Sequence, residues 1–404
     1  MADLEPPASQ VDDRNTRGTG AGQGSDRGHA PSAQGAPDHR AEGNGRDGAR
    51  GDASRPAGSS AQPAAIPRQA YAAIDLGTNN CRLLIARPSG EHFVVIDAFS
   101  RVVRLGEGLA QTGRLSEAAM DRALGALRVC ADKLRRRNVH LARSVATEAC
   151  RRASNGEAFI ERVREETGIV LDVISAQEEA RLAVLGCHVL LEQGEGPAMI
   201  FDIGGGSTEL VLIETGEAVP RILDWQSVPW GVVSLTESYP AADDETDTDR
   251  LHRYRHMRAA VSGAFRDFST RIEPFRDTPM QTSPRLLGTS GTVTTLASLH
   301  LGLPQYDRRA VDGLIVEATA MRDIAKKLST LSPVERQELP CIGRDRAELV
   351  VAGCAILETI LDLWPAARLG VADRGIREGI LRSLMAGARI SEQNRALARR
   401  IKAL

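Results

Sequence analysis

The chain has 404 residues, in which 51 Lys and Arg stand against 53 Asp and Glu and only 3% are aromatic. This nearly balanced charge provides no basic field, and the few aromatic rings provide no stacking platform, so we expect no nucleic-acid partner. The length is sufficient for two domains with a sizeable core.

The first 67 residues differ in composition from the rest of the chain. Gly, Ala, Pro, Ser, Asp and Arg predominate, and the only large apolar residues are Met1, Leu4, Val11 and Ile66. Such a segment cannot bury enough apolar surface to offset the loss of chain entropy. The composition therefore predicts a disordered tail over residues 1–67.

The chain carries no sign of a targeting or membrane-spanning segment. Its N-terminus lacks the charged and apolar regions of a signal peptide, and no run of 18 apolar residues occurs anywhere. We therefore expect no membrane association and a cytoplasmic location. The six cysteines lack the spacing of metal ligands, which favours reduced and mostly buried thiols.

The first half of the ordered chain reads as a meander of three strands followed by alternating helices and strands. In chain order, the predicted elements are strands over residues 70–76, 81–87 and 92–98, a helix over 116–137, a strand over 143–147, a helix over 155–167 and a strand over 169–174. Ser116 is the predicted N-cap of the first helix, and Gly168 the C-cap of the second.

The second half repeats this mixture of strands and helices around a polar, acidic loop over residues 240–250. The predicted elements are a helix over residues 178–193, a strand-turn-strand over 198–213, a strand over 285–288 and one over 368–372, and helices over 251–275, 293–300, 315–330 and 346–363. The pattern is typical of an α/β protein with mixed sheets.

An internal repeat indicates where the chemistry lies. The segment IDLGTNNCRLLI around Asp75 aligns with FDIGGGSTELVL around Asp202, 127 residues later, and both read apolar, Asp, apolar, Gly, small turn, apolar strand. One chain thus contains two copies of a strand-turn-strand unit, which predicts a duplicated domain with a cleft between the copies.

The residue types of this repeat suit a phosphate group and a hydrated metal ion. A Gly turn lets the backbone approach an anion, and neighbouring N–H and hydroxyl groups act as donors. The candidate phosphate-binding residues in the two turns are Gly77, Thr78, Asn79, Asn80, Gly204, Gly205, Gly206, Ser207 and Thr208. Asp75 and Asp202 cannot bind phosphate themselves, but they suit a hydrated Mg²⁺ that does.

A third Gly turn follows the strand over residues 285–288. Ser290, Gly291 and Thr292 lead into a helix, whose N-terminus offers free N–H groups to an anion. A plain capped helix start is the alternative at this position. The segment DRGIREG over residues 373–379 follows the strand over 368–372 and is either a further part of the site or a turn with solvated charges.

Together these segments resemble the exopolyphosphatase and guanosine pentaphosphate phosphohydrolase family, which has the fold of actin, sugar kinases and heat-shock chaperone ATPases. The resemblance is carried in family order by IDLGTNNCRLLIAR, VVRLGEGL, VATEACRRA, LDVISAQEEARL, FDIGGGSTELV, LLGTSGTVTTLA and VADRGIREGIL. It implies actin-like domains over residues 68–150 and 151–385, with the last helices free to pack back on the first domain, and a C-terminal helix over 386–404.

The resemblance also implies roles for individual residues. Glu148 matches the carboxylate that deprotonates the attacking water, and Asp172 and Glu179 match further Mg²⁺ partners, although Ala176 replaces the usual Gly of that segment. Arg104 and Arg151 are the matching candidates for phosphate clamps.

The implied reaction is hydrolysis of the terminal phosphoryl group of polyphosphate or guanosine pentaphosphate, with Mg²⁺ or Mn²⁺ as cofactor, a part in the stringent response and a possible homodimer. Long family members continue into additional helical domains after REGIL, whereas this sequence stops soon after it, so processive degradation is in doubt. The alternatives are a kinase of the same fold, a non-catalytic sensor of stress nucleotides, and a chaperone-like ATPase, which would need a peptide-binding domain.

Overall fold

The computed structural model describes residues 69–402 apart from residues 91, 217–218, 243 and 277–283, and gives no side-chain detail for residues 390–402. The tail predicted over residues 1–67 lies outside the described residues.

The first sheet has five strands in the order β3-β2-β1-β4-β5. Its strands are β1 (Ala70–Leu76), β2 (Asn80–Ser89), β3 (His92–Val102), β4 (Val139–Ala146) and β5 (Leu171–Val173). The strands β1, β2 and β3 form the predicted antiparallel meander, while β4 and β5 run parallel to β1. This sheet therefore continues past residue 150, where the sequence analysis places a domain boundary.

The second sheet has six strands in the order β10-β11-β9-β6-β7-β8. Its strands are β6 (Pro197–Ile203), β7 (Thr208–Glu214), β8 (Arg221–Val228), β9 (Arg285–Thr289), β10 (Ile315–Glu317) and β11 (Arg368–Ala372). It again joins an antiparallel meander, β6-β7-β8, to parallel strands, β9 and β11. The repeat seen in the sequence is therefore a repeat of topology, and the predicted α/β class with mixed sheets is confirmed.

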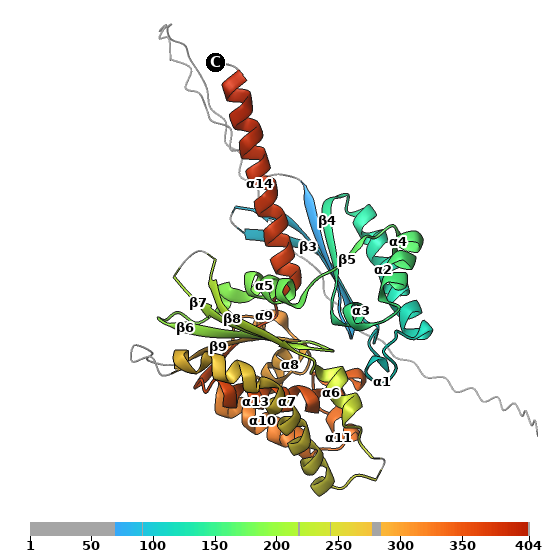
Figure 1. Ribbon diagram of the computed structural model, residues 1–404, viewed down its shortest axis with the longest axis vertical. Coiled ribbons are helices and arrows are strands. Elements are labelled where there is room, and N and C mark those ends of the chain that lie inside the picture. The colour runs from blue at the N-terminus through green and yellow to red at the C-terminus, as the bar shows by residue number, and fades with distance from the viewer. Residues whose placement is uncertain (1–68, 91, 217–218, 243, 277–283, 403–404) are drawn as a thin grey trace, which may run out of the picture. The chain divides into compact units, whose positions relative to one another are not determined.

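Fourteen α-helices are described around the two sheets (Figure 1). They are α1 (Leu109–Thr112), α2 (Glu117–Arg136), α3 (Glu148–Arg152), α4 (Gly156–Thr167), α5 (Ala176–Cys187), α6 (Val232–Ser238), α7 (Asp247–Arg276), α8 (Gly291–His300), α9 (Arg308–Val311), α10 (Ala318–Thr330), α11 (Pro333–Gln337), α12 (Arg344–Ala347), α13 (Leu349–Leu363) and α14 (Ile376–Lys402). The predicted caps are confirmed: Ser116 accepts a hydrogen bond from the Ala119 N–H, and Gly168 has φ 72°.

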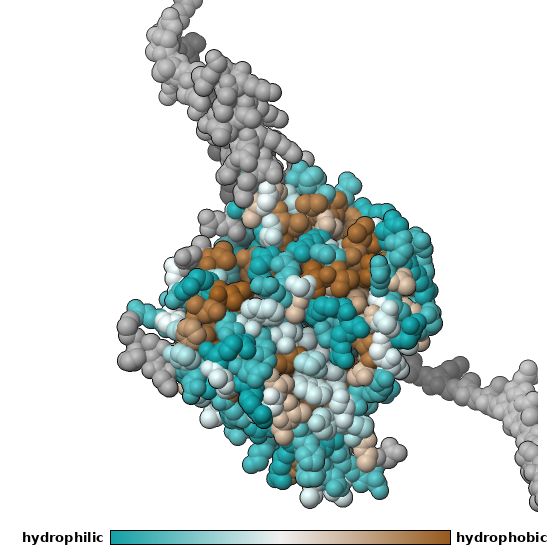
Figure 2. Space-filling model, in the orientation of Figure 1, coloured by the Kyte–Doolittle hydropathy of each residue, from teal (hydrophilic) through white to brown (hydrophobic). Residues whose placement is uncertain are grey.

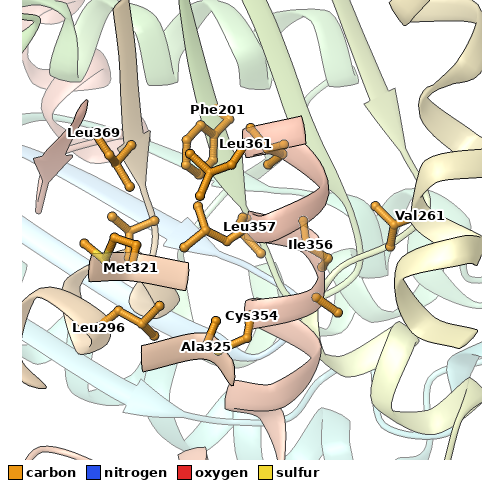
Figure 3. Packing of buried hydrophobic residues seen from close by; sticks show 14 of the residues in the cluster. Phe201, Val261, Leu296, Met321, Ala325, Cys354, Ile356, Leu357, Leu361 and Leu369 are labelled. Atoms are coloured by element: carbon orange, nitrogen blue, oxygen red, sulfur yellow. The ribbon is translucent and has the colours of Figure 1, made fainter. Parts of the chain in front are cut away.

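Each sheet is covered by helices on both faces. In the first sheet, α2 and α4 pack on one face and α14 on the other, where Ile380 and Leu381 lie among strand residues such as Ala73. In the second sheet, α7, α8, α10 and α13 share one core with the strands, and α5 covers the opposite face. Figure 3 shows this core around Leu357 and Phe201, the residue that precedes Asp202, so the strand carrying that aspartate is firmly held.

Several predicted bounds are wrong in ways that have local causes. The prediction of a helix over residues 315–330 fails at its start, because residues 315–317 pair with β11 as a short edge strand. β4 begins at Val139, earlier than predicted, because β1 pairs with it along its whole length. The helix predicted over residues 178–193 ends at Cys187 and continues as a short 3₁₀ turn.

The described thiols are mostly buried, as the sequence predicts. None of the described helices is both long and apolar enough to cross a membrane. All six cysteines are unpaired, and five of them are buried. Apolar residues gather on the face in Figure 2 where β4 and β5 lie in Figure 1, and the exposed apolar side chains there are Leu141, Val170 and Val173.

Candidate active site

Two matching turns form the centre of a cleft between the sheets. In the turn from β1 to β2, the Gly77 N–H donates to the Asn80 carbonyl at 2.9 Å, and in the turn from β6 to β7 the Gly204 N–H donates to the Ser207 carbonyl at 2.9 Å. Residues of both turns line one cavity of about 160 Å³. The two turns are therefore the same structure, brought face to face.

Glycine is required where the two turns touch. A Cβ atom on Gly205 would lie 3.0 Å from the Thr78 Cβ and 3.1 Å from the Asn79 backbone nitrogen. A Cβ atom on Gly206 would lie 2.8 Å from the Thr78 hydroxyl oxygen and 3.0 Å from the Glu148 Cγ. The close approach leaves no room for a side chain, so the glycines keep the backbone of the second turn open to the cleft.

Free backbone donors line this cleft. The carbonyls of Gly204 and Gly205 accept hydrogen bonds from the first residues of α6, whereas the N–H groups of Gly205 and Gly206 have no acceptor in the described chain. The predicted third turn also reaches the cavity, and Ser290 caps α8 by accepting a hydrogen bond from the Val293 N–H. Three backbone segments thus present donors to one space, the arrangement that suits a phosphate group.

Two carboxylates at the ends of β1 and β6 face the same cleft. Asp75 and Asp202 accept no hydrogen bond and form no ion pair among the described residues. Burial, reinforced by the charges of Glu209 and Asp75, raises the pKa of Asp202 to about 8, against the opposing effect of Arg82. Burial also raises the pKa of Asp75. Both groups are therefore destabilised as anions when no metal ion is bound, even though Arg82 partly offsets the effect.

These carboxylates fit the implied metal ion. Among the described residues, no group of three or more His, Cys, Asp and Glu side chains is placed to hold a metal by itself. Mg²⁺ suits such a site, because it keeps several waters and uses only one or two carboxylates together with substrate phosphates. The buried Oδ1 of Asn79 has no hydrogen-bond partner among the described residues and is an acceptor suited to a water of such an ion.

Two further carboxylates, Glu148 and Glu179, line the cleft and share one arginine. Arg151 donates to the Glu148 Oε2 at 2.6 Å and to the Glu179 Oε2 at 3.1 Å, and it also donates to the Ile174 carbonyl at 2.8 Å. The second oxygen of Glu148 lies 3.8 Å from Arg152. The second oxygen of Glu179 has no hydrogen-bond partner in the described chain.

The electrostatic environment of Glu179 is unusual. Burial and the charge of Glu209 raise the pKa of Glu179 well above its ordinary value, although Arg151 opposes the shift. Burial likewise raises the pKa of Glu209, whose carboxylate accepts hydrogen bonds from Ser207 at 2.7 Å and Ser227 at 2.9 Å. A carboxylate with a raised pKa is a stronger proton acceptor than an ordinary glutamate.

The structure does not bring Asp172 into the cleft. Its side chain is 59% exposed and forms an ion pair with Arg143 at 3.2 Å. Asp172 lies on β5, the edge strand of the first sheet, opposite Val145 of β4. The prediction that Asp172 shares a metal with Asp75 is corrected, because its side chain lies on the outer edge of the sheet.

Three predicted phosphate contacts are also placed outside the cavity. Thr208 begins β7 and its buried hydroxyl donates to the Trp230 carbonyl at 2.6 Å. Arg151 forms ion pairs with the two glutamates, so it holds their carboxylates and is not free to clamp a phosphate group. Arg104 has φ 47° and pairs with Asp345 at 2.7 Å, and of these two side chains only Asp345 lines the cleft.

The other predicted residues lie where expected, and three further residues join them. Lining the cavity are Asp75, Gly77, Thr78, Asn79, Asn80, Glu148, Glu179, Asp202, Gly204, Gly205, Gly206, Ser207, Ser290, Gly291 and Thr292. Sequence reasoning missed Arg82, Glu209 and Arg346, which also line it. Arg82 and Glu209 stand at the same place in the repeat, opposite Asp75 and Asp202 on the neighbouring strands, and a charge inside an apolar strand was the signal for both.

Comparisons with known proteins point to one family of phosphatases. The sequence profile of the Ppx/GppA phosphatase family matches residues 84–387. Exopolyphosphatase 2 of Mycobacterium tuberculosis is 32% identical over 329 residues, which cover 78% of this chain and 98% of that protein. A guanosine-5'-triphosphate,3'-diphosphate pyrophosphatase of Aliivibrio fischeri is 30% identical over 311 residues, which cover 77% of this chain and 58% of that protein.

Solved structures give the same result for the fold. A Ppx/GppA family member from Aquifex aeolicus is 30% identical, with a TM-score of 0.63, covering 79% of this chain and 98% of that one. An exopolyphosphatase from Cytophaga hutchinsonii is 26% identical, with a TM-score of 0.67 and the same two coverages.

Proposed function

Because the chain belongs to the Ppx/GppA phosphatase family, we propose that it hydrolyses the terminal phosphoanhydride of polyphosphate or guanosine pentaphosphate and releases orthophosphate. The observation that carries this proposal is the pair of matching turns, which touch through Gly205. Beside two aspartates, they present N–H groups that, like the aspartate carboxylates, have no hydrogen-bond partner among the described residues. Such a site binds a phosphoryl group and stabilises the charge that grows on it in the transition state.

The cofactor of the proposed reaction is Mg²⁺, which Mn²⁺ can replace. Asp75 and Asp202 are the residues that would hold it, and their raised pKa values support this role because a bound cation would stabilise both as anions. When bound, the ion neutralises charge on the phosphoryl oxygens. The chain itself supplies the backbone donors that orient the phosphoryl group.

Two glutamates compete for the role of general base. Glu148 was expected from the sequence, but both of its oxygens lie within 3.8 Å of an arginine side chain. Glu179 has one oxygen free toward the cleft and a raised pKa, as a general base needs near neutral pH. We therefore place proton abstraction from water on Glu179, with Arg151 holding both carboxylates in position.

The alternative functions differ in the amount of orthophosphate release that they predict. A kinase of this fold would release little orthophosphate without an acceptor, and a sensor would bind substrate without turnover. Orthophosphate release from polyphosphate with no acceptor present would separate both alternatives from the proposed hydrolysis. A lack of release from both polyphosphate and guanosine pentaphosphate would contradict the proposed hydrolysis and leave both alternatives standing.

Removal of divalent metal should abolish turnover. We expect no measurable orthophosphate release in excess EDTA and full recovery on addition of Mg²⁺ or Mn²⁺, because two unpartnered carboxylates otherwise face the anionic substrate. Colorimetric phosphate release before and after chelation provides the measurement. Full activity in EDTA would remove the metal from the mechanism.

Gly205→Val should weaken substrate binding. The added side chain would meet Thr78 and Asn79 and force the two turns apart, at a cost of about 1–3 kcal/mol. We expect KM to rise roughly tenfold or more as a result. Gly125→Val is the matched control, since a Cβ atom at Gly125 in α2 meets nothing within 4 Å. Equal effects of the two substitutions would contradict a role for the tight contact.

A further inference from the structure

A groove between two neighbouring helices, α7 and α13, shares no residue with the proposed active site (Figure 1). Its volume is about 580 Å³, compared with about 160 Å³ for the cleft. Most of its wall belongs to α7, whose lining residues recur mostly every three or four positions and so form one stripe along the helix. Thr359, Asp362 and Leu363 at the end of α13 complete the wall.

The arginines of α7 fall into two groups. Four of them form an ion pair with a carboxylate: Arg250, Arg253, Arg258 and Arg271. The other three, which have no ion pair within the described part of the chain, are Arg255, Arg266 and Arg276. All three unpaired arginines line the groove, whereas only one of the paired arginines, Arg258, does so. The stripe of α7 that faces the groove is therefore the one that carries uncompensated positive charge.

The wall of the groove offers these arginines no free carboxylate. Asp362 is the one acidic residue among the described residues that line the groove. It already forms ion pairs with Arg258 at 2.5 Å and with Arg322 at 2.8 Å. The positive charge of the stripe therefore attracts an anion from solution.

Arg276 provides a second, independent indication of a ligand. It donates to the Ser269 hydroxyl oxygen at 2.9 Å, seven residues earlier, so its guanidinium reaches back along α7 to about one turn from Arg266. Its Nε is buried and has no hydrogen-bond partner among the described residues. The helix dipole accounts for a cation at the end of α7, but it does not account for a buried donor without an acceptor. An oxygen atom of a bound anion would satisfy this donor.

The residue types of the groove fit a phosphate group with an attached organic part. Guanidinium groups bind phosphate oxygens through parallel N–H donors, and the hydroxyl groups of Ser262 and Ser269 are further donors to an anion. The volume of the groove is in the range of sites for small molecules and exceeds what one phosphate needs. Ala259 and Leu363 provide an apolar part of the wall for the rest of such a molecule.

We propose that the groove between α7 and α13 is a binding site for a small phosphorylated molecule, whose phosphate group contacts Arg266 and Arg276. The proposal goes beyond the proposed hydrolysis, because none of the residues placed in the cleft takes part in it. The phosphate chemistry has two possible sources: an inorganic phosphate compound, or the phosphate groups of an organic molecule such as a nucleoside diphosphate.

Arginine labelling with phenylglyoxal, followed for each residue by peptide mass spectrometry, tests this site in the full chain. The probes are pyrophosphate and adenosine diphosphate, at an ionic strength matched with sodium chloride. EDTA is present in every sample, so that the proposed hydrolysis does not consume a probe. The measurement locates the bound anion residue by residue, so binding in the cleft does not interfere and no turnover is needed.

A probe at ten times its Kd should slow the labelling of Arg266 and Arg276 about tenfold. Labelling of Arg136 on α2, whose side chain is 77% exposed, should not change. Protection by pyrophosphate and adenosine diphosphate alike would assign the site to the phosphate group alone, and protection by adenosine diphosphate only would show that the organic part is also bound. Both results support the site.

Arg266→Gln should remove the protection of Arg276, whereas Arg136→Gln, the matched control, should retain it. Arg266 is exposed on α7, so we expect the variant to fold with an unchanged melting temperature. Labelling rates of Arg266 and Arg276 that are the same with and without both probes would overturn the proposal. An equal slowing at Arg136 would also overturn it, because the effect would then be general and not that of a site.

Discussion

Glu179→Gln should reduce kcat by about 10²–10⁴-fold, or roughly 3–5 kcal/mol of barrier, because glutamine keeps the size of the side chain but cannot accept a proton. Substrate affinity should change only a few-fold, since the Gly turns and the metal do the binding. Burial and Glu209 raise the pKa of Glu179, so wild-type kcat should increase with pH as this carboxyl loses its proton. Single-turnover kinetics across pH provides the measurement.

Glu148→Gln is the matched comparison for this prediction. It removes one of the two carboxylates that Arg151 holds, and leaves the bond between Arg151 and Glu179 in place. We expect a loss of at most about tenfold, as for a residue that positions another. The opposite order of effects, with Glu148→Gln nearly inactive and Glu179→Gln active, would return the role of base to Glu148.

Asp202→Asn should abolish turnover and at the same time stabilise the metal-free protein. Loss of the metal contact removes several kcal/mol of transition-state stabilisation, which corresponds to roughly a thousandfold in rate. The stability of the metal-free protein should increase, because the substitution removes a carboxylate that is unfavourable when ionised. Burial and the charges of Glu209 and Asp75 raise the pKa of this group from 3.8 to about 8.

The sign of the pH dependence follows from proton binding. Between about pH 4 and pH 8 the folded protein keeps a proton on Asp202 that the unfolded chain has released. The stability of the metal-free protein therefore falls as pH rises through this window. Thermal melts should show the Asn variant melting above wild type at pH 8, with no difference near pH 3. Addition of Mg²⁺ should raise the wild-type melting temperature alone, and an equal rise in both proteins would exclude Asp202 as a ligand.

The central turns could be predicted from the sequence because their geometry is local. Asp75 and Asp202 lie near the ends of strands with the same sequence pattern. When a Gly turn follows a short apolar strand, the last polar residue of that strand lies at the edge of the sheet, so both positions could be inferred. Alternation along a strand could also have excluded Thr208. It begins β7 and its buried hydroxyl is bonded to Trp230, while the preceding residue, Ser207, lines the cleft.

Other parts of the site depend on tertiary structure and could not be predicted in this way. Asp172 and Glu179 are close in sequence, yet one lies on an exposed edge strand and the other on a buried helix turn. Arg346 reaches the cleft from α12, a four-residue helix with no pattern that points to a site. The resemblance matched Arg104 to a phosphate clamp. Its ion pair with Asp345 joins distant parts of the chain, so no local sequence pattern predicts it.

Hydrolysis in ¹⁸O-labelled water tests the account most directly. Water attack on the terminal phosphorus, with Glu179 as the base, predicts that orthophosphate released from polyphosphate carries one oxygen from solvent, while the shortened chain carries none. Mass spectrometry of both products measures this. Label in the remaining chain would place the attack on the wrong phosphorus, and a lack of orthophosphate release in Mg²⁺ from both polyphosphate and guanosine pentaphosphate would contradict the proposed hydrolysis.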